Sequence, residues 1–125
     1  SIETLFEETL EYTRQRSVFG RPVFEYQNTR FTLASAKAQA AMLRVFVDDC
    51  LREAMEGTLS GERAAMAKLI GSEMQNRLLD DFLQLHGGYG FMSEYKISRA
   101  WVDARVARIY GGTSEIMKEI IARSL

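Results

Sequence analysis

The sequence is poor in cysteine, histidine and proline, with one residue of each among 125. Because Cys50 has no possible partner within the chain, no intrachain disulfide can form, and we expect a reducing, intracellular setting. Because His86 is the single histidine, a multi-histidine metal site is excluded, and the sequence contains no CxxC pair. We interpret His86, which stands beside two glycines, as a packing residue rather than a general base.

The chain also lacks long apolar runs and a charge of one sign. No run approaches the about 18 apolar residues that a membrane span needs. The 16 basic and 17 acidic residues give a net charge of -1, which argues against binding to nucleic acid or an anionic membrane. The chain does not begin with methionine, and its first residues already have a helical pattern. We therefore expect residues 1–125 to be one domain of a longer protein.

Hydrophobic residues recur at helical spacing almost everywhere. The pattern predicts helices over residues 2–16, 28–56, 60–85 and 94–108, and a last helix from 113 or 114. Gly57 is expected to end the second helix, and Ser60 is expected to cap the third. Short connections between long helices favour an all-α, up-down four-helix bundle with a short additional helix. We expect Ile97, Trp101 and Val102 to be buried in the fourth helix. The stripe on the second helix is interpreted as core: Phe31, Ala34, Ala38, Met42, Val45, Phe46, Asp49 and Cys50.

Three irregular stretches could hold a ligand, although a helical scaffold or interaction module is the default from composition alone. "RQRSVFGRPV" gathers three arginines, whose guanidinium groups suit phosphate oxygens, around an exposed aromatic ring. "QLHGGYGF" places Gln84 beside glycines that leave backbone N–H groups accessible. "YGGTSEI" offers N–H groups at a helix start, which attract an anion or a polarised carbonyl, and Thr113 or Ser114 is expected to cap that helix.

Together, "YTRQRSVFGRPVFEYQ", "QLHGGYGFMSEY" and "DARVARIYGGTSEIMKEIIAR" closely resemble the carboxy-terminal domain of acyl-CoA dehydrogenases, most of all the long-chain type. The resemblance covers essentially all 125 residues. It implies a fragment of a three-domain, FAD-dependent enzyme that oxidises acyl-CoA thioesters to trans-2-enoyl-CoA. It further implies a homo-oligomer that passes electrons to an electron-transfer flavoprotein, in the bacterial cytoplasm or the mitochondrial matrix.

The resemblance also assigns roles to individual positions. It implies that Arg16 contacts the FAD pyrophosphate, that Phe19 packs near the adenosine, and that the turn at residues 84–88 approaches the cofactor from another subunit. The full set implied for FAD is Arg16, Phe19, Gln27, Gln84, Leu85, His86, Gly87, Gly88, Thr113 and Glu115. Gly111 and Gly112 are implied for the substrate, with the Gly111 N–H donating to the thioester carbonyl.

Gly111 stands where many family members carry the catalytic glutamate, and glycine has no side chain that accepts a proton. Long-chain members carry that glutamate on the preceding helix, upstream of residue 1. We therefore expect no catalytic base within the chain, and a fragment that is inactive by itself. Two alternatives remain open: a non-catalytic helical module that kept the bundle, or an acyl-CoA oxidase of the same fold.

Overall fold

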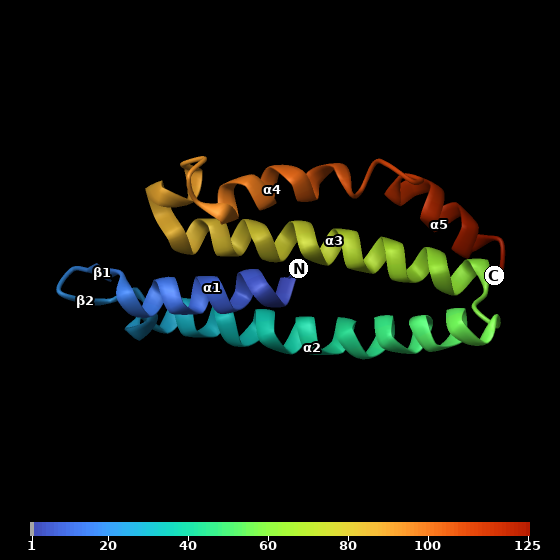
Figure 1. Ribbon diagram of the computed structural model, residues 1–125, viewed down its shortest axis with the longest axis horizontal. Helices are drawn as coiled ribbons and strands as arrows, with labels where there is room; N and C mark the ends of the chain where they lie inside the picture. Colours follow the sequence, from blue (N-terminus) through green and yellow to red (C-terminus); the bar gives the residue numbers. More distant parts are fainter. Residues whose placement is uncertain (1) are drawn as a thin grey trace.

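The computed structural model describes residues 2–125, which form five α-helices (Figure 1). The helices are α1 (Ile2–Gln15), α2 (Gln27–Glu56), α3 (Gly61–His86), α4 (Lys96–Val106) and α5 (Ser114–Ala122). A small antiparallel hairpin, β1 (Ser17–Val18) and β2 (Arg21–Pro22), and the 3₁₀ helix η1 (Val23–Glu25) join α1 to α2. The 3₁₀ helix η2 (Gly87–Phe91) follows α3.

Helix α3 is the centre of the bundle. Helices α1 and α2 pack along one side of it, and α4 and α5 lie end to end along the other (Figure 1). The all-α bundle expected from the sequence is confirmed, and the helix ends fall within two residues of the predicted positions. The hairpin adds a strand pair where the sequence had predicted only an interruption.

Local chemistry explains the connection between α2 and α3. Gly57 ends α2 in the left-handed conformation, at φ 73°, which costs glycine little. Ser60 then caps α3, as predicted, because its hydroxyl oxygen accepts a hydrogen bond from the Arg63 N–H at 3.1 Å. Arg63 also reaches back to α2, where it pairs with Asp49 at 2.6 Å and Glu53 at 2.7 Å.

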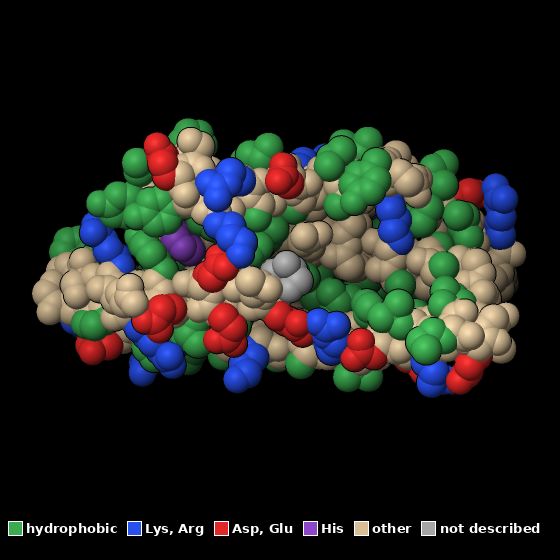
Figure 2. Space-filling view, in the orientation of Figure 1, with side chains coloured by type: hydrophobic (Ala, Val, Ile, Leu, Met, Phe, Trp, Pro, Cys, Tyr) green, Lys and Arg blue, Asp and Glu red, His purple; other side chains and the backbone are tan. Residues whose placement is uncertain are grey.

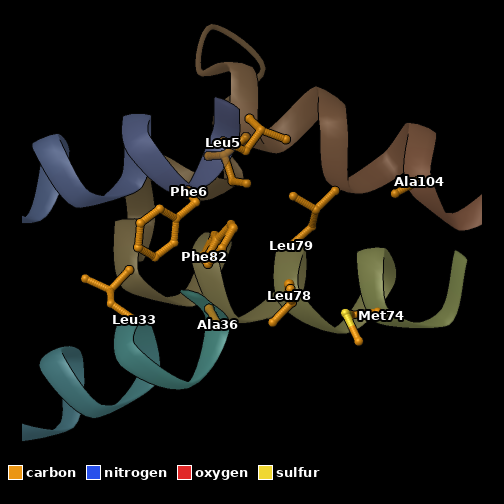
Figure 3. Close-up of a cluster of buried hydrophobic side chains, with 10 residues drawn as sticks. Leu5, Phe6, Leu33, Ala36, Met74, Leu78, Leu79, Phe82 and Ala104 are labelled. Carbon is orange, nitrogen blue, oxygen red and sulfur yellow. The ribbon is translucent and has the colours of Figure 1, made fainter. Parts of the chain in front are cut away.

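The core forms where α1, α2 and α4 meet the middle and end of α3 (Figure 3). Leu78, Leu79 and Phe82 of α3 are at most 1% exposed, and Phe6 of α1 packs with its ring centroid 6.1 Å from that of Phe82. Each such side chain contributes roughly 1.5–3 kcal/mol when buried. The buried hydroxyl of Thr9 donates to the Leu5 carbonyl, so it carries no unpaired polar group into this core.

The stripe predicted as core on α2 is mostly exposed in this chain. Phe31, Met42 and Val45 are 64%, 63% and 71% exposed. Cys50, the last residue of the predicted stripe, is buried as expected, at 5% exposure. The inward face of α2 otherwise carries a second stripe: Thr29, Leu33, Ala36, Leu43 and Val47. Both stripes have helical spacing, so spacing alone could not identify the one that faces α3.

A similar correction applies to α4, which lies at the surface of the bundle. Ile97 is buried as predicted, but Trp101 and Val102 are 39% and 60% exposed. The Trp101 indole N–H donates to Asp80 on α3 at 2.9 Å, so the ring lies against the edge of the helix pair rather than beneath it. None of the helices in residues 2–125 combines the length and apolar character needed to cross a bilayer.

Candidate functional site

The first group of predicted residues lines a groove of 460 Å³ at the hairpin end of the molecule. Its walls include Arg16 and Val18 at the start of the hairpin, and Gln84, Gly87 and Gly88 at the end of α3. Sequence reasoning had placed these residues in two separate motifs. Folding brings them together because α1 and α3 run side by side and end at the same level (Figure 1). We call this space the hairpin groove.

Two glycines determine the path of the turn at residues 87–90, which contributes Gly87 and Gly88 to the groove lining. Gly87 has φ 61° and ψ -140°, a conformation that is essentially restricted to glycine. Gly90 could not be replaced without movement, since a Cβ there would lie 2.5 Å from the backbone oxygen of Leu83. Gly88, by contrast, has open space around it. The groove therefore has a wall of bare backbone at residues 87–88.

Aromatic side chains support this wall from beneath. The Tyr12 and His86 rings stack with centroids 4.1 Å apart and planes at 20°, and the Tyr12 hydroxyl donates to the His86 carbonyl at 3.1 Å. The Tyr95 ring meets both of them edge-on. Little of the histidine (purple) shows at the surface in Figure 2, where it lies among hydrophobic side chains (green). The turn is thus fixed by packing with α1.

The environment of His86 makes it a structural group. Its Nδ1 carries the proton, because it lies 2.8 Å from the Phe82 carbonyl, which can only accept. Burial lowers the pKa of His86 below its ordinary value, and burial likewise raises the pKa of Tyr12. The neutral ring is therefore favoured at pH 7, in agreement with its interpretation as a packing residue.

The three arginines in and just before the hairpin have different surroundings. Only Arg16 lines the hairpin groove, and its guanidinium lies over the Tyr89 ring, 5.1 Å from the centroid. Arg14 lies over Phe24 and Arg21 over Tyr26. In the described part of the chain, no carboxylate forms an ion pair with any of the three. Arg16 is thus the arginine available to an anion in the groove.

Two other residues predicted for the cofactor are exposed and lie outside the lining of the groove. Phe19 is 97% exposed at the tip of the hairpin, with an unusual φ of 49° for a residue with a side chain. Gln27 is the exposed first residue of α2. Neither residue is among those that line the hairpin groove, and their roles toward the cofactor stay predictions.

The second group lies between α4 and α5, where residues 111–113 form what we call the double-glycine turn. Gly111 and Gly112 have φ of 62° and 97°, both in the region that favours glycine. Thr113 caps α5 as predicted, by accepting a hydrogen bond from the Ile116 N–H at 3.3 Å.

The N–H groups available to a ligand are not those expected at the helix start. The Ser114 N–H already donates to the Arg108 carbonyl at 3.1 Å, and the Glu115 carboxylate accepts from its own backbone N–H and from the Thr113 hydroxyl. These two hydrogen bonds lower the pKa of Glu115. Within residues 2–125, the N–H groups of Gly111 and Gly112 meet no hydrogen-bond acceptor. The free donors therefore belong to the double-glycine turn itself.

The double-glycine turn is held by a residue that sequence reasoning missed. Lys68 of α3 donates a hydrogen bond from its Nζ to the Gly112 carbonyl. A signal was present in the sequence, because Lys68 is the only charged residue between Arg63 and Glu73, in the middle of an apolar segment.

One chain does not bring the two groups together. Lys68 beneath the double-glycine turn and His86 beside the hairpin groove are 18 positions apart on α3. At 1.5 Å per residue, this corresponds to about 27 Å along the helix. In Figure 1 the hairpin and α5 accordingly lie toward opposite ends of the molecule. Nowhere in residues 2–125 do acidic, histidine or cysteine side chains gather in threes as a metal ion would need.

Comparison with known proteins decides the family. The family model "Acyl-CoA dehydrogenase, C-terminal domain" matches residues 1–125. The chain belongs to this family. The acyl-CoA dehydrogenase resemblance inferred from the three sequence motifs is therefore confirmed.

Individual acyl-CoA dehydrogenase relatives agree with this assignment. The chain is 50% identical over 123 residues to the long-chain specific acyl-CoA dehydrogenase, mitochondrial, of Sus scrofa, covering 98% of this chain and 29% of the relative. It is 34% identical over 121 residues to the caffeyl-CoA reductase–Etf complex subunit of Acetobacterium woodii, covering 95% of this chain and 31% of that protein.

The fold agrees as well. The crystal structure of an acyl-CoA dehydrogenase from Geobacillus kaustophilus matches with a TM-score of 0.95 and 43% identity, covering 98% of this chain and 32% of that one. The chain thus spans about three tenths of the length of the family members it matches.

Proposed function

We propose that the chain is the FAD-binding and oligomerisation domain of a three-domain acyl-CoA dehydrogenase, here called the parent enzyme. The parent enzyme would oxidise acyl-CoA thioesters to trans-2-enoyl-CoA. FAD, when bound, supplies the electron acceptor for this chemistry. Membership of the family and the activities of the relatives support the proposal. The strongest support comes from the two separated groups of site residues.

The hairpin groove fits the pyrophosphate of FAD. Its guanidinium group, on Arg16, has no carboxylate partner within residues 2–125, and Gly87 and Gly88 contribute bare backbone to the same lining. A guanidinium fork suits phosphate oxygens, and glycines allow a phosphate to approach the backbone closely. Gln84 adds a side chain that can donate and accept at the same wall.

The double-glycine turn fits the thioester carbonyl. The Gly111 N–H is free to donate, and a hydrogen bond to that oxygen strengthens as negative charge develops on it. The same turn offers no group that could remove the α-proton. We propose that this base comes from outside residues 1–125, from a glutamate on the preceding part of the parent enzyme.

Assembly follows from the distance between the two groups. Because they lie about 27 Å apart along α3, we propose that the hairpin groove of one subunit completes the cofactor site of another. The exposed apolar stripe on α2, including Phe31, Met42 and Val45, is the surface proposed to meet a second copy. Light scattering on the parent enzyme tests this, and a monomer that binds FAD fully would contradict it.

An electron-transfer flavoprotein is the proposed partner that reoxidises the parent enzyme. The Acetobacterium woodii relative is named as part of a complex with Etf, which supports this choice. An intracellular location, in bacterial cytoplasm or mitochondrial matrix, is proposed because relatives come from both sources.

Replacement of Arg16 tests the assignment of FAD. In the parent enzyme, we expect Arg16→Met to weaken FAD binding by about tenfold to about a hundredfold, since hydrogen bonds to charged groups contribute about 1.5–3 kcal/mol. Arg14→Met, which removes an arginine outside the groove lining, is the matched control. Equal FAD dissociation constants for the two variants, measured by flavin fluorescence, would refute the role of Arg16.

The reaction itself is tested by adding acyl-CoA to FAD-loaded parent enzyme and following the flavin absorbance. Bleaching is expected, whereas residues 1–125 alone should bind FAD weakly and show none. No bleaching by any acyl-CoA would leave the non-catalytic scaffold as the function. Recovery of colour with oxygen consumption and peroxide formation would instead identify an acyl-CoA oxidase.

A further inference from the structure

Lys68 differs from the other basic residues near the double-glycine turn because its partner is a backbone carbonyl and not a carboxylate. Its side chain is half-buried, and its Nζ donates to the Gly112 carbonyl. In the described part of the chain no carboxylate pairs with it. The nearby Glu73 is engaged instead with Arg108 at 3.5 Å and Lys118 at 4.0 Å.

A hydrogen bond to the Gly112 carbonyl restricts the backbone of the double-glycine turn directly. Glycine is the most flexible residue, and two in succession leave the peptide planes free to rotate unless something holds them. The neighbouring backbone bonds, from Tyr110 to Val106 and from Ser114 to Arg108, fix the turn only on either side. The bond from Lys68 is the one hydrogen bond described within the two glycines themselves.

The free N–H of Gly111 lies between two anchored groups. On one side the Tyr110 N–H donates to the Val106 carbonyl, and on the other the Gly112 carbonyl accepts from Lys68. Only two peptide units lie between these anchors, and one of them carries the Gly111 N–H, so holding both ends restricts the direction of that donor. A charged donor makes a stronger bond to a carbonyl than a neutral one. Partial burial keeps that bond from being replaced by water.

We propose that Lys68 is a positioning residue for thioester recognition: it fixes the double-glycine turn so that the Gly111 N–H points at the thioester carbonyl. This inference rests on the proposed acyl-CoA dehydrogenase function. Lys68 itself touches neither substrate nor cofactor in this scheme. Its effect reaches the reaction through the backbone donor, which must lie at about 2.7–3.1 Å from the developing oxyanion.

The test compares three variants of the parent enzyme. Lys68→Met removes the donor and keeps the length of the side chain, and Lys68→Arg keeps a charged donor. Lys118→Met removes a nearby exposed lysine that lies 4.0 Å from Glu73, as the control. Turnover is measured together with FAD content and with the infrared carbonyl band of bound trans-2-enoyl-CoA, labelled with ¹³C at the thioester carbon.

We expect Lys68→Met to lower kcat by about tenfold to about a hundredfold, because small misplacements of an oriented donor have effects of this size. KM and FAD content should change little. The carbonyl band of the bound ligand should move toward its position in free enoyl-CoA, since the hydrogen bond is weaker. Lys68→Arg should restore most of kcat and of the band shift, and Lys118→Met should behave as wild type.

The outcomes separate this inference from the function on which it rests. If wild-type parent enzyme neither turns over nor shifts the carbonyl band, the proposed function fails. If wild type does both and Lys68→Met retains both, the role of Lys68 is refuted. A Lys68→Met protein that loses FAD or stability while its carbonyl band is unchanged has lost only a structural contact, which also refutes it. Should Lys68→Met not fold, Lys68→Gln is judged by the same band.

Discussion

The two glycine turns at the candidate site differ in how they are held. The turn at residues 87–90 rests on packed rings, with Tyr12 stacked on His86 and Tyr95 edge-on to both. The double-glycine turn has one polar anchor, the bond from Lys68 to Gly112. The first turn is therefore fixed by shape over a broad area, whereas the second is held by one charged donor together with the backbone bonds on either side of it.

Glycine serves a different purpose in each turn. At Gly90 the neighbouring backbone leaves no room for a Cβ, whereas at Gly111 there is open space but φ is 62°. The first glycine is required by packing and the second by conformation. This difference suits the proposed roles, since a cofactor wall must be rigid while a backbone donor needs only a defined direction.

The largest effect is expected where packing requires glycine. Gly90→Ala places a Cβ 2.5 Å from the Leu83 carbonyl oxygen, which is backbone and cannot turn aside. We expect a loss of about 1–3 kcal/mol in the free energy of unfolding, typical of overpacked sites. Thermal or denaturant unfolding of the parent enzyme measures it.

Gly88→Ala is the matched control, two positions away in the same turn. Nothing lies within 4 Å of a Cβ at Gly88, and its φ is outside the positive range. Its stability should therefore stay close to that of wild type. Equal losses for the two variants would show that the turn responds to any added side chain, and that the contact with Leu83 is not the reason for glycine.

The sequence predicted the features that depend on neighbouring residues. The caps at Ser60 and Thr113 and the stop at Gly57 were identified because each depends on a few adjacent positions. The helices followed from the spacing of apolar residues. The turn motifs pointed correctly to the family, since they occur in the right order along one helical domain.

Features that depend on distant residues could not be predicted in this way. The bond from Lys68 to Gly112 joins positions 44 apart, and the bond from Tyr12 to His86 joins positions 74 apart. The choice between two apolar stripes on α2 depends on where α1 and α3 lie, which spacing does not reveal. For the same reason, the residue pattern alone did not separate Arg16 from Arg14 and Arg21. The family resemblance singled out Arg16, and the folded chain places it alone of the three in the lining of the groove.

A smaller effect is expected from the ring beneath Arg16. In the parent enzyme, Tyr89→Leu removes the face over which the guanidinium lies, while Tyr89→Phe keeps it. Since an exposed cation–π contact contributes about 0.5–1 kcal/mol, Tyr89→Leu should weaken FAD binding about two- to fivefold and Tyr89→Phe hardly at all. In an Arg16→Met background, the leucine substitution should have no further effect. An undiminished effect there would mean that Tyr89 acts on the cofactor independently of Arg16.

The smallest expected effect is a pH dependence of stability. It arises from His86, which packs with Tyr12 beneath the turn at residues 87–90. Burial lowers the pKa of His86, partly opposed by its hydrogen bond to Phe82 and by the charge of Glu8. The folded chain thus holds this proton less tightly than the unfolded chain, where the pKa is about 6.5. The contribution of His86 to the free energy of unfolding is therefore fully present above about pH 6.5, and it falls as the pH drops toward the pKa of His86 in the folded chain.

Because His86 is the only histidine in the chain, its ring signal in an NMR titration needs no assignment. We expect its midpoint below the ordinary value, and closer to that value in Tyr12→Leu, which removes the stacked ring and opens His86 to water. A wild-type midpoint at or above the ordinary value would show that the charged imidazolium is accommodated. In that case the turn at residues 87–90 would be stabilised electrostatically, and it would no longer differ from the double-glycine turn in how it is held.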